Sequence, residues 1–187
     1  MSDDVFADRR RALEESFFHE KNKQLLEQLR TKLSAETHQQ VLAAALGVHD
    51  PKVLADLYQA GVTNETLAAL FAVPMIAVAW ADGKLDDKER QAILKSVEEA
   101  GVPADSPPYK LLQGWLNQRP EANLFTAWRE YVSAMLPKLE PAAKAEWKQA
   151  ALRRARQVAA ASGGVLGIGS VSAPEQAVLQ EIEAAFG

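Results

Sequence analysis

The 187-residue chain contains no cysteine. This absence excludes a disulfide framework, a thiolate zinc site and a cysteine nucleophile. Long apolar runs are also missing, because the most apolar uncharged stretch, residues 66–81, is interrupted by Pro74 and is shorter than the ~20 residues of a membrane span. The N-terminus lacks the apolar region of a secretory signal. We therefore expect a cytoplasmic protein with no transmembrane segment.

An excess of basic residues is missing as well. The net charge is −4 and the pI is about 5.5, whereas a general nucleic-acid binder needs a basic face that displaces counterions from phosphates. We expect no nucleic-acid partner. The content of 48% hydrophobic and 25% charged residues is ordinary for a globular protein, and a chain of this length can bury a sizeable core.

Strand-like alternation between hairpin turns is absent, and apolar residues recur at helical spacings nearly throughout. The pattern predicts an all-α protein of about nine helices, with a single compact domain at residues 34–187 and an N-terminal helical extension at residues 1–33. A long helix is expected from Phe6 to Leu33 because its apolar residues form one stripe. The stripe consists of Leu13, Phe17, Leu25, Leu29 and Leu33.

Capping residues mark the starts of the later helices. Ser34 is expected to cap a helix that ends at Leu46, and Asp50 followed by Pro51 is a clear start signal. Thr63 is expected to cap the apolar helix over residues 67–81, which Pro74 should kink because proline lacks an amide donor. Further helices are expected at 87–100, from 107, from 120, at 141–161 and at 173–186.

The stretch VAWADGKLDDKER, residues 78–90, is the most informative in the chain. Aligned on the second half of a calcium-binding EF-hand loop, it places Gly83 at position 6, Asp86 at position 9 and Glu89 at position 12, with Asp82 at position 5. Positions 1 and 3 carry no side-chain oxygen. The pattern predicts a weak Ca²⁺ or Mg²⁺ site formed by Asp82, Asp86 and Glu89, with water or another segment completing the shell.

A helix cap is the alternative interpretation of the same residues. Asp86-x-x-Glu89 is a capping-box pattern, and Ser172-x-x-Glu175 repeats it before the last helix. The segments KLDDKE and SVSAPE share this plan, so we expect two related helix–turn–helix units whose turns lie close in space. A capping Glu89 reaches back to the N-cap amide, whereas a ligand Glu89 turns into the loop, and the sequence leaves both interpretations open.

The segment AWADGKLDDKER, between an apolar helix and a second helix, resembles the TerB-like family, named for tellurite resistance. The resemblance extends over residues 63–186 and implies an all-helical fold with two acidic turns that bind a divalent cation. The family's acidic positions correspond to Asp82, Asp86 and Glu89, and in the second turn to Glu175 alone. Residues 167–169, Gly-Ile-Gly, stand where the second acidic turn would carry its carboxylate.

No catalytic constellation accompanies these residues. His19, His38 and His49 form no H-E-x-x-H pattern, and GGVLGIG, residues 163–169, matches neither common nucleotide-binding glycine motif. We therefore expect no enzyme, no catalytic residue and no cofactor, but an interaction module with a protein partner or a second copy of the chain. The alternative is a protein that binds or senses Ca²⁺ or Mg²⁺, linked to a stress or tellurite-resistance-type response.

Overall fold

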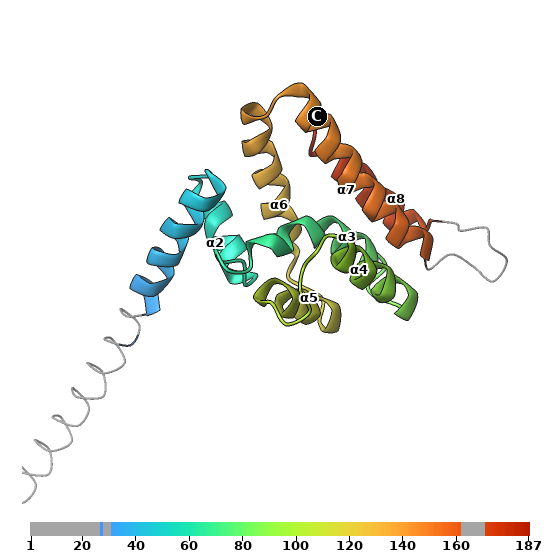
Figure 1. Ribbon diagram of the computed structural model, residues 1–187, viewed down its shortest axis with the longest axis horizontal. Coiled ribbons are helices and arrows are strands. Elements are labelled where there is room, and N and C mark those ends of the chain that lie inside the picture. The colour runs from blue at the N-terminus through green and yellow to red at the C-terminus, as the bar shows by residue number, and fades with distance from the viewer. Residues whose placement is uncertain (1–26, 28–30, 162–170) are drawn as a thin grey trace, which may run out of the picture.

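The computed structural model describes residues 27, 31–161 and 171–187 (Figure 1). These residues are mostly helical and contain no strand, which confirms the predicted all-α class. The helix over residues 31–46 comes first. The later elements are α2 (Pro51–Gln59), the 3-10 helix η1 (Leu67–Ala72), α3 (Val73–Ala79), α4 (Asp87–Glu99), α5 (Pro107–Asn117), α6 (Ala122–Met135), the 3-10 helix η2 (Leu136–Lys138), α7 (Pro141–Ala161) and α8 (Ala173–Ala184).

The helix over residues 31–46 runs without a break through Ser34. The predicted helix start at Ser34 is wrong, and the predicted count of about nine helices is not confirmed. The Ser34 hydroxyl lies 3.5 Å from Nδ1 of His38, one turn further along the same helix. Of the predicted apolar stripe, Leu33 alone lies within the described residues. The division into an extension and a domain at residue 34 stays a prediction.

The short helix α3 lies at the centre of the fold. Six of its seven residues are buried, and it contacts α4, α6, α7 and α8. A helix that is apolar on all sides is stable only when other elements surround it. The predicted single helix over residues 67–81 is instead η1 followed by α3. Pro74 falls in the first turn of α3, where its missing amide donor costs no helical hydrogen bond.

The predicted cap at Thr63 is also wrong. Thr66 organises this turn instead, since its hydroxyl accepts a hydrogen bond from the Thr63 amide (2.7 Å) and donates one to the Gly61 carbonyl (2.8 Å). Thr66 itself is the residue before η1, and its side chain caps no amide of that helix. The turn therefore closes on the end of α2 rather than on the element that follows.

The other helices pack in pairs around α3. Helices α7 and α8 run antiparallel, side by side, and both contact α3 (Figure 1). Helix α2 packs against α6, and α5 packs against η1. Buried side chains from all these elements and from the end of the first helix belong to one continuous hydrophobic core. In the described residues no helix has the length and apolar character needed to cross a membrane.

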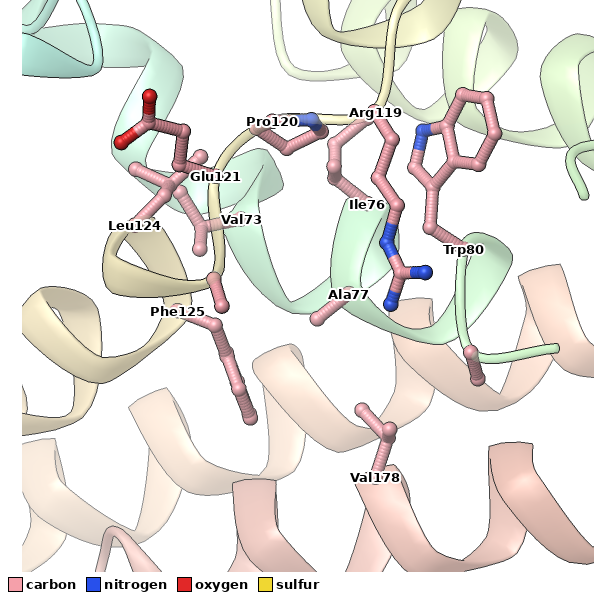
Figure 2. Close-up of a pocket in the computed structure, with 12 residues that line it drawn as sticks. Val73, Ile76, Ala77, Trp80, Arg119, Pro120, Glu121, Leu124, Phe125 and Val178 are labelled. Atoms are coloured by element: carbon pink, nitrogen blue, oxygen red, sulfur yellow. The ribbon is translucent and has the colours of Figure 1, made fainter. Parts of the chain in front are cut away.

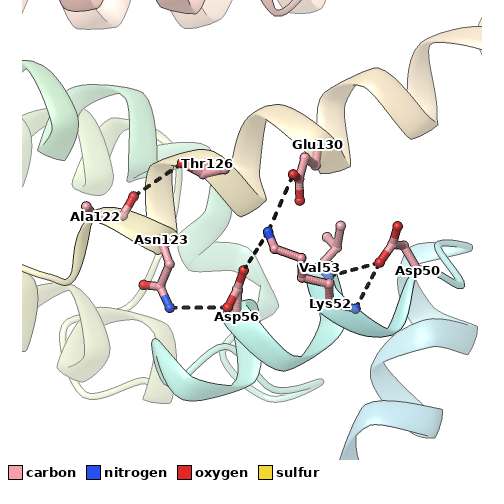
Figure 3. Close-up of polar contacts among 8 residues, drawn as sticks. All are labelled: Asp50, Lys52, Val53, Asp56, Ala122, Asn123, Thr126 and Glu130. Atoms are coloured by element: carbon pink, nitrogen blue, oxygen red, sulfur yellow. Dashed lines mark hydrogen bonds and ion pairs between the residues drawn. The ribbon is translucent and has the colours of Figure 1, made fainter.

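Polar contacts fix α2 against α6 (Figure 3). Asp50 accepts hydrogen bonds from the amides of Lys52 (2.8 Å) and Val53 (3.4 Å), which confirms the predicted Asp50-Pro51 helix start. The Lys52 ammonium lies 3.3 Å from Asp56 on its own helix and 3.7 Å from Glu130 on α6. These charges lie at the edge of an apolar interface, so they orient two helices that burial holds together.

Candidate functional site

The acidic turn between α3 and α4 is built around Gly83. Its φ of +88° lies in the left-handed region that glycine adopts without strain, and its amide donates to the Trp80 carbonyl (3.0 Å). Asp82 is exposed, and one of its carboxylate oxygens accepts a hydrogen bond from the Lys84 amide (2.9 Å). Asp82 thus closes a local turn with its own backbone.

Asp86 and Glu89 form a complete capping box at the start of α4. One oxygen of Asp86 accepts hydrogen bonds from the amides of Lys88 and Glu89, both at 2.8 Å. In return, an oxygen of Glu89 accepts the Asp86 amide at 2.9 Å. The Glu89 carboxylate therefore turns back to the N-cap, which is the capping orientation that the sequence left open.

Ser172 and Glu175 form a second capping box at the start of α8. The Ser172 amide donates to Glu175 at 2.6 Å, and the Glu175 amide donates to the Ser172 hydroxyl at 3.4 Å. Glu89 is 5% exposed and Glu175 is 4% exposed, and few charged side chains are buried to this degree. The two predicted turns therefore share the capping-box pattern, and each buries its glutamate.

The charges of the two turns act on each other. Burial, and then the negative charges of Asp86, Glu175 and Asp82, raise the pKa of the Glu89 carboxyl from its ordinary 4.5 to about 7, against the opposing effect of the Asp86 amide hydrogen bond. Since such Coulomb effects weaken with distance, the effect of Glu175 indicates that the two turns lie near each other, as the sequence predicts. At neutral pH Glu89 carries a partial proton.

The four predicted metal ligands do not form a metal centre by themselves. Within the part of the chain that the structure describes, no three histidine or acidic side chains gather so that they could hold one metal ion. One oxygen each of Asp82, Asp86, Glu89 and Glu175 is also engaged by backbone amides. Divalent-cation binding stays a prediction, and hydrogen bonding at both turns favours the capping role.

A pocket that the sequence analysis did not anticipate lies beside the acidic turn (Figure 2). It measures about 180 Å³ and opens between α3, the start of α6 and α8. Its floor is apolar, since Val73, Ile76 and Leu124 are each 1% exposed. Other lining residues are Ala77, Trp80, Ala81, Arg119, Pro120, Glu121, Ala122, Phe125 and Val178.

Hydrogen bonds between helices fix the pocket wall. The Trp80 indole donates to the Trp115 carbonyl (2.9 Å), and the Trp115 indole donates to the Ala60 carbonyl at the end of α2 (3.2 Å). Arg90 on α4 donates to the Leu116 carbonyl (2.7 Å) and to the Asn117 side chain (3.1 Å). The last turn of α5 is thus held in place directly before the segment that enters the pocket.

Arg119 is the charged residue that extends into this opening. Figure 2 shows its side chain passing Trp80 and its guanidinium lying beside Ala77, while the Glu121 carboxylate turns away. One guanidinium nitrogen would lie 3.9 Å from a Cβ placed on Gly83, so Arg119 also approaches the acidic turn. Among the described residues, ion pairs are formed by other lysines and arginines, and Arg119 forms none.

Within the described residues, the remaining sequence candidates contribute no second site. The rings of His38 and Tyr58 lie near each other, with centroids 5.6 Å apart and planes tilted by 32°, and His49 is exposed. His19 and the glycine-rich segment 163–169 lie outside the described residues. Arg119 and its pocket carry no sequence motif, because their residues come from three separate stretches of the chain.

A comparison of the chain with known protein families, with curated proteins and with solved structures found no match.

Proposed function

We propose that the chain is a non-enzymatic helical interaction module of the TerB-like kind, and that its N-terminal helix docks on a second copy of the chain or on a protein partner. One observation carries this proposal. Within residues 31–46 this helix buries side chains in the core only near its C-terminal end, at Leu42, Ala43 and Leu46. Residues 31–34 and 36–38 are exposed, and the helix projects away from the other elements (Figure 1).

The exposed part of this helix carries an apolar side chain. Leu33 is 62% exposed. It lies nine residues before Leu42, which is about two and a half helical turns, so the two leucines point to opposite sides of the helix. Leu42 enters the core, and Leu33 is left for another surface. Leu25 and Leu29 precede Leu33 at intervals of four residues in the sequence, which extends the predicted stripe.

A charge on this stripe tests the proposal in the full-length chain. Leu33→Glu should weaken self-association, measured by light scattering over a concentration series, because a carboxylate would be buried at the interface. Thr31→Glu adds the same charge on the opposite side of the helix, and we expect it to associate like the wild type. A chain that begins at residue 34 should be monomeric. A full-length chain that is monomeric at every concentration contradicts self-association, and a partner would then be the remaining form of the proposal.

Divalent-cation binding at the acidic turns is the second candidate function. The observation that favours it is the mutual effect of the carboxylates, since the charges of Asp86, Glu175 and Asp82 all oppose ionisation of Glu89. A bound Ca²⁺ or Mg²⁺ would offset this repulsion. Titration with either ion should raise the melting temperature and change the fluorescence of Trp80, which lies two residues before Asp82. The absence of both changes at millimolar ion contradicts this function.

A further inference from the structure

The pocket between α3, α6 and α8 combines two features. Its floor is buried and apolar, and Arg119, which has no ion pair within the described part of the chain, extends into its mouth. Sites for small ligands are typically concave and mostly apolar, with few polar groups that fix the orientation of the ligand. These features therefore suit an apolar ligand that carries one negative charge.

The volume of the pocket sets the size of the apolar group. At about 180 Å³ it exceeds the roughly 150 Å³ of a dry apolar cavity that holds one benzene molecule. An aromatic ring would contact Ile76 and Leu124 on the floor, and Phe125 would be positioned to pack against it. A long acyl chain would extend beyond this space, so the pocket favours a single ring.

The charges at the mouth select the polar group. The Arg119 guanidinium presents planar donors that suit a carboxylate, and in the described residues no acidic side chain pairs with them. Helix α6 begins at Ala122 on the same rim, and its N-cap residue Glu121 provides no side-chain cap. The positive end of the helix dipole lies on this rim, and the negative charge of Glu121 at the same helix end offsets part of its attraction for an anion.

We infer that this pocket binds a small aromatic monocarboxylate, with its ring between α3, α6 and α8 and its carboxylate on Arg119. The site is formed before the ligand arrives, because Trp80 is fixed by its bond to the Trp115 carbonyl and α5 is fixed by Arg90. Neither the docking of the N-terminal helix nor cation binding at the acidic turns is needed for it. A free aromatic acid and a peptide with a C-terminal phenylalanine would both present one aromatic ring and one carboxylate to this site.

The test compares phenylacetate with its neutral amide, phenylacetamide, by ligand-observed NMR titration of the full-length protein. For a ligand of this size we expect a dissociation constant on the order of 1 mM for the acid and about fivefold to tenfold weaker binding of the amide. Arg119→Gln should reduce the affinity for the acid to the affinity for the amide, and it should leave the affinity for the amide unchanged. Arg153→Gln removes an exposed arginine on α7 and should change neither.

A second variant tests the apolar part of the site. Ala77 lies beside the guanidinium in the opening (Figure 2), so Ala77→Leu should fill it and weaken acid and amide alike by about fivefold or more. Arg119 is exposed, so the Arg119→Gln result stands even if the Ala77 variant folds poorly. In a parallel titration N-acetylphenylalanine replaces phenylacetate. Tighter binding of N-acetylphenylalanine would indicate the C-terminus of a peptide as the ligand, and tighter binding of phenylacetate would indicate a free aromatic acid.

Three results would each overturn the inference. These are equal affinity for the acid and the amide, unchanged acid binding by Arg119→Gln, and no saturation by the acid at concentrations about tenfold above 1 mM. None of these measurements depends on the oligomeric state of the chain. Failure of the pocket and failure of the docking helix are therefore separate outcomes.

Discussion

Glu89 is a buried acid on which two effects oppose each other: its hydrogen bond favours the ionised carboxylate, and its surroundings favour the protonated form. As the third residue of α4 it must accept the Asp86 amide, a bond that suits the ionised form. Its burial and its three acidic neighbours favour the protonated form, and together they raise its pKa to about 7. The side chain thus caps a helix at an electrostatic cost that depends on pH.

The first prediction concerns the pH dependence of stability. Between about pH 4.5 and 7 the native state holds a proton on Glu89 that the unfolded chain has already lost, so stability falls as pH rises through this window. A pKa difference of about 2.5 units corresponds to a loss of up to ~3 kcal/mol by pH 8. Glu89→Gln keeps an oxygen for the Asp86 amide and carries no charge. Its stability should therefore vary less with pH and exceed that of the wild type at pH 8.

Urea unfolding at several pH values, with a chelator present, measures this effect. Glu98→Gln is the matched control, because it removes an exposed carboxylate from the same helix and should keep the slope of the wild type. If Glu89→Gln and the wild type lose stability equally between about pH 5 and pH 8, Glu89 is not the titrating group.

At the scale of single elements, the two capping boxes share a pattern but differ in strength. Asp86 accepts two amides at 2.8 Å, whereas the Ser172 hydroxyl accepts one amide at 3.4 Å. Asp86 also places a negative charge at the positive end of α4, while its charge opposes ionisation of Glu89. Removing the side chain and removing only its charge should therefore have different consequences.

The second prediction separates these effects of Asp86. Asp86→Ala should destabilise the protein by ~1–2 kcal/mol, because it leaves two first-turn amides without their acceptor. Asp86→Asn keeps an acceptor and removes a charge next to Glu89, so it should cost less than the alanine variant at pH 8. Ser172→Ala should cost less than Asp86→Ala. Urea midpoints at one pH provide the comparison, and equal losses for Asp86→Ala and Asp86→Asn would show that charge outweighs capping.

The caps show which elements the sequence could predict. Asp50, Asp86 and Ser172 were placed correctly because a cap depends on residues three or four positions apart. The predicted helix start at Ser34 was wrong, because a serine can occur within a helix as well as at its N-cap, and no proline or glycine near Ser34 ends the preceding helix. The predicted cap at Thr63 is wrong because the Thr66 hydroxyl closes this turn instead, and the element that follows is a 3-10 helix.

At the scale of the whole molecule, packing determines what the sequence left open. The charge on Glu89 depends on Glu175, which lies 86 positions later in the sequence, and the Arg119 pocket combines α3, α6 and α8. Neither relation leaves a local pattern. The central position of α3 does leave a local pattern, since an uncharged run of this length has to be covered on all sides.

The third prediction follows from the uneven packing of the chain. Helix α3 is contacted by four other α-helices. Amide hydrogen exchange should be slowest at the amides that are hydrogen-bonded at the end of α3, because these hydrogen bonds break only when the whole domain unfolds. Within the first helix the rates should divide. Residues 41–46 are anchored by Leu42, Ala43 and Leu46, whereas residues 31–38 lack buried side chains and should exchange faster by one order of magnitude or more.

The same experiment connects packing to the proposed function. If Leu33 docks on a second copy, protection over residues 31–38 should increase with protein concentration, while protection of α3 should stay constant. Leu33→Glu should abolish the increase, and Thr31→Glu should preserve it. If residues 31–38 are as protected as residues 41–46 even at the lowest concentration, this segment is already packed within one chain, and its exposed leucine would have no surface to offer a partner.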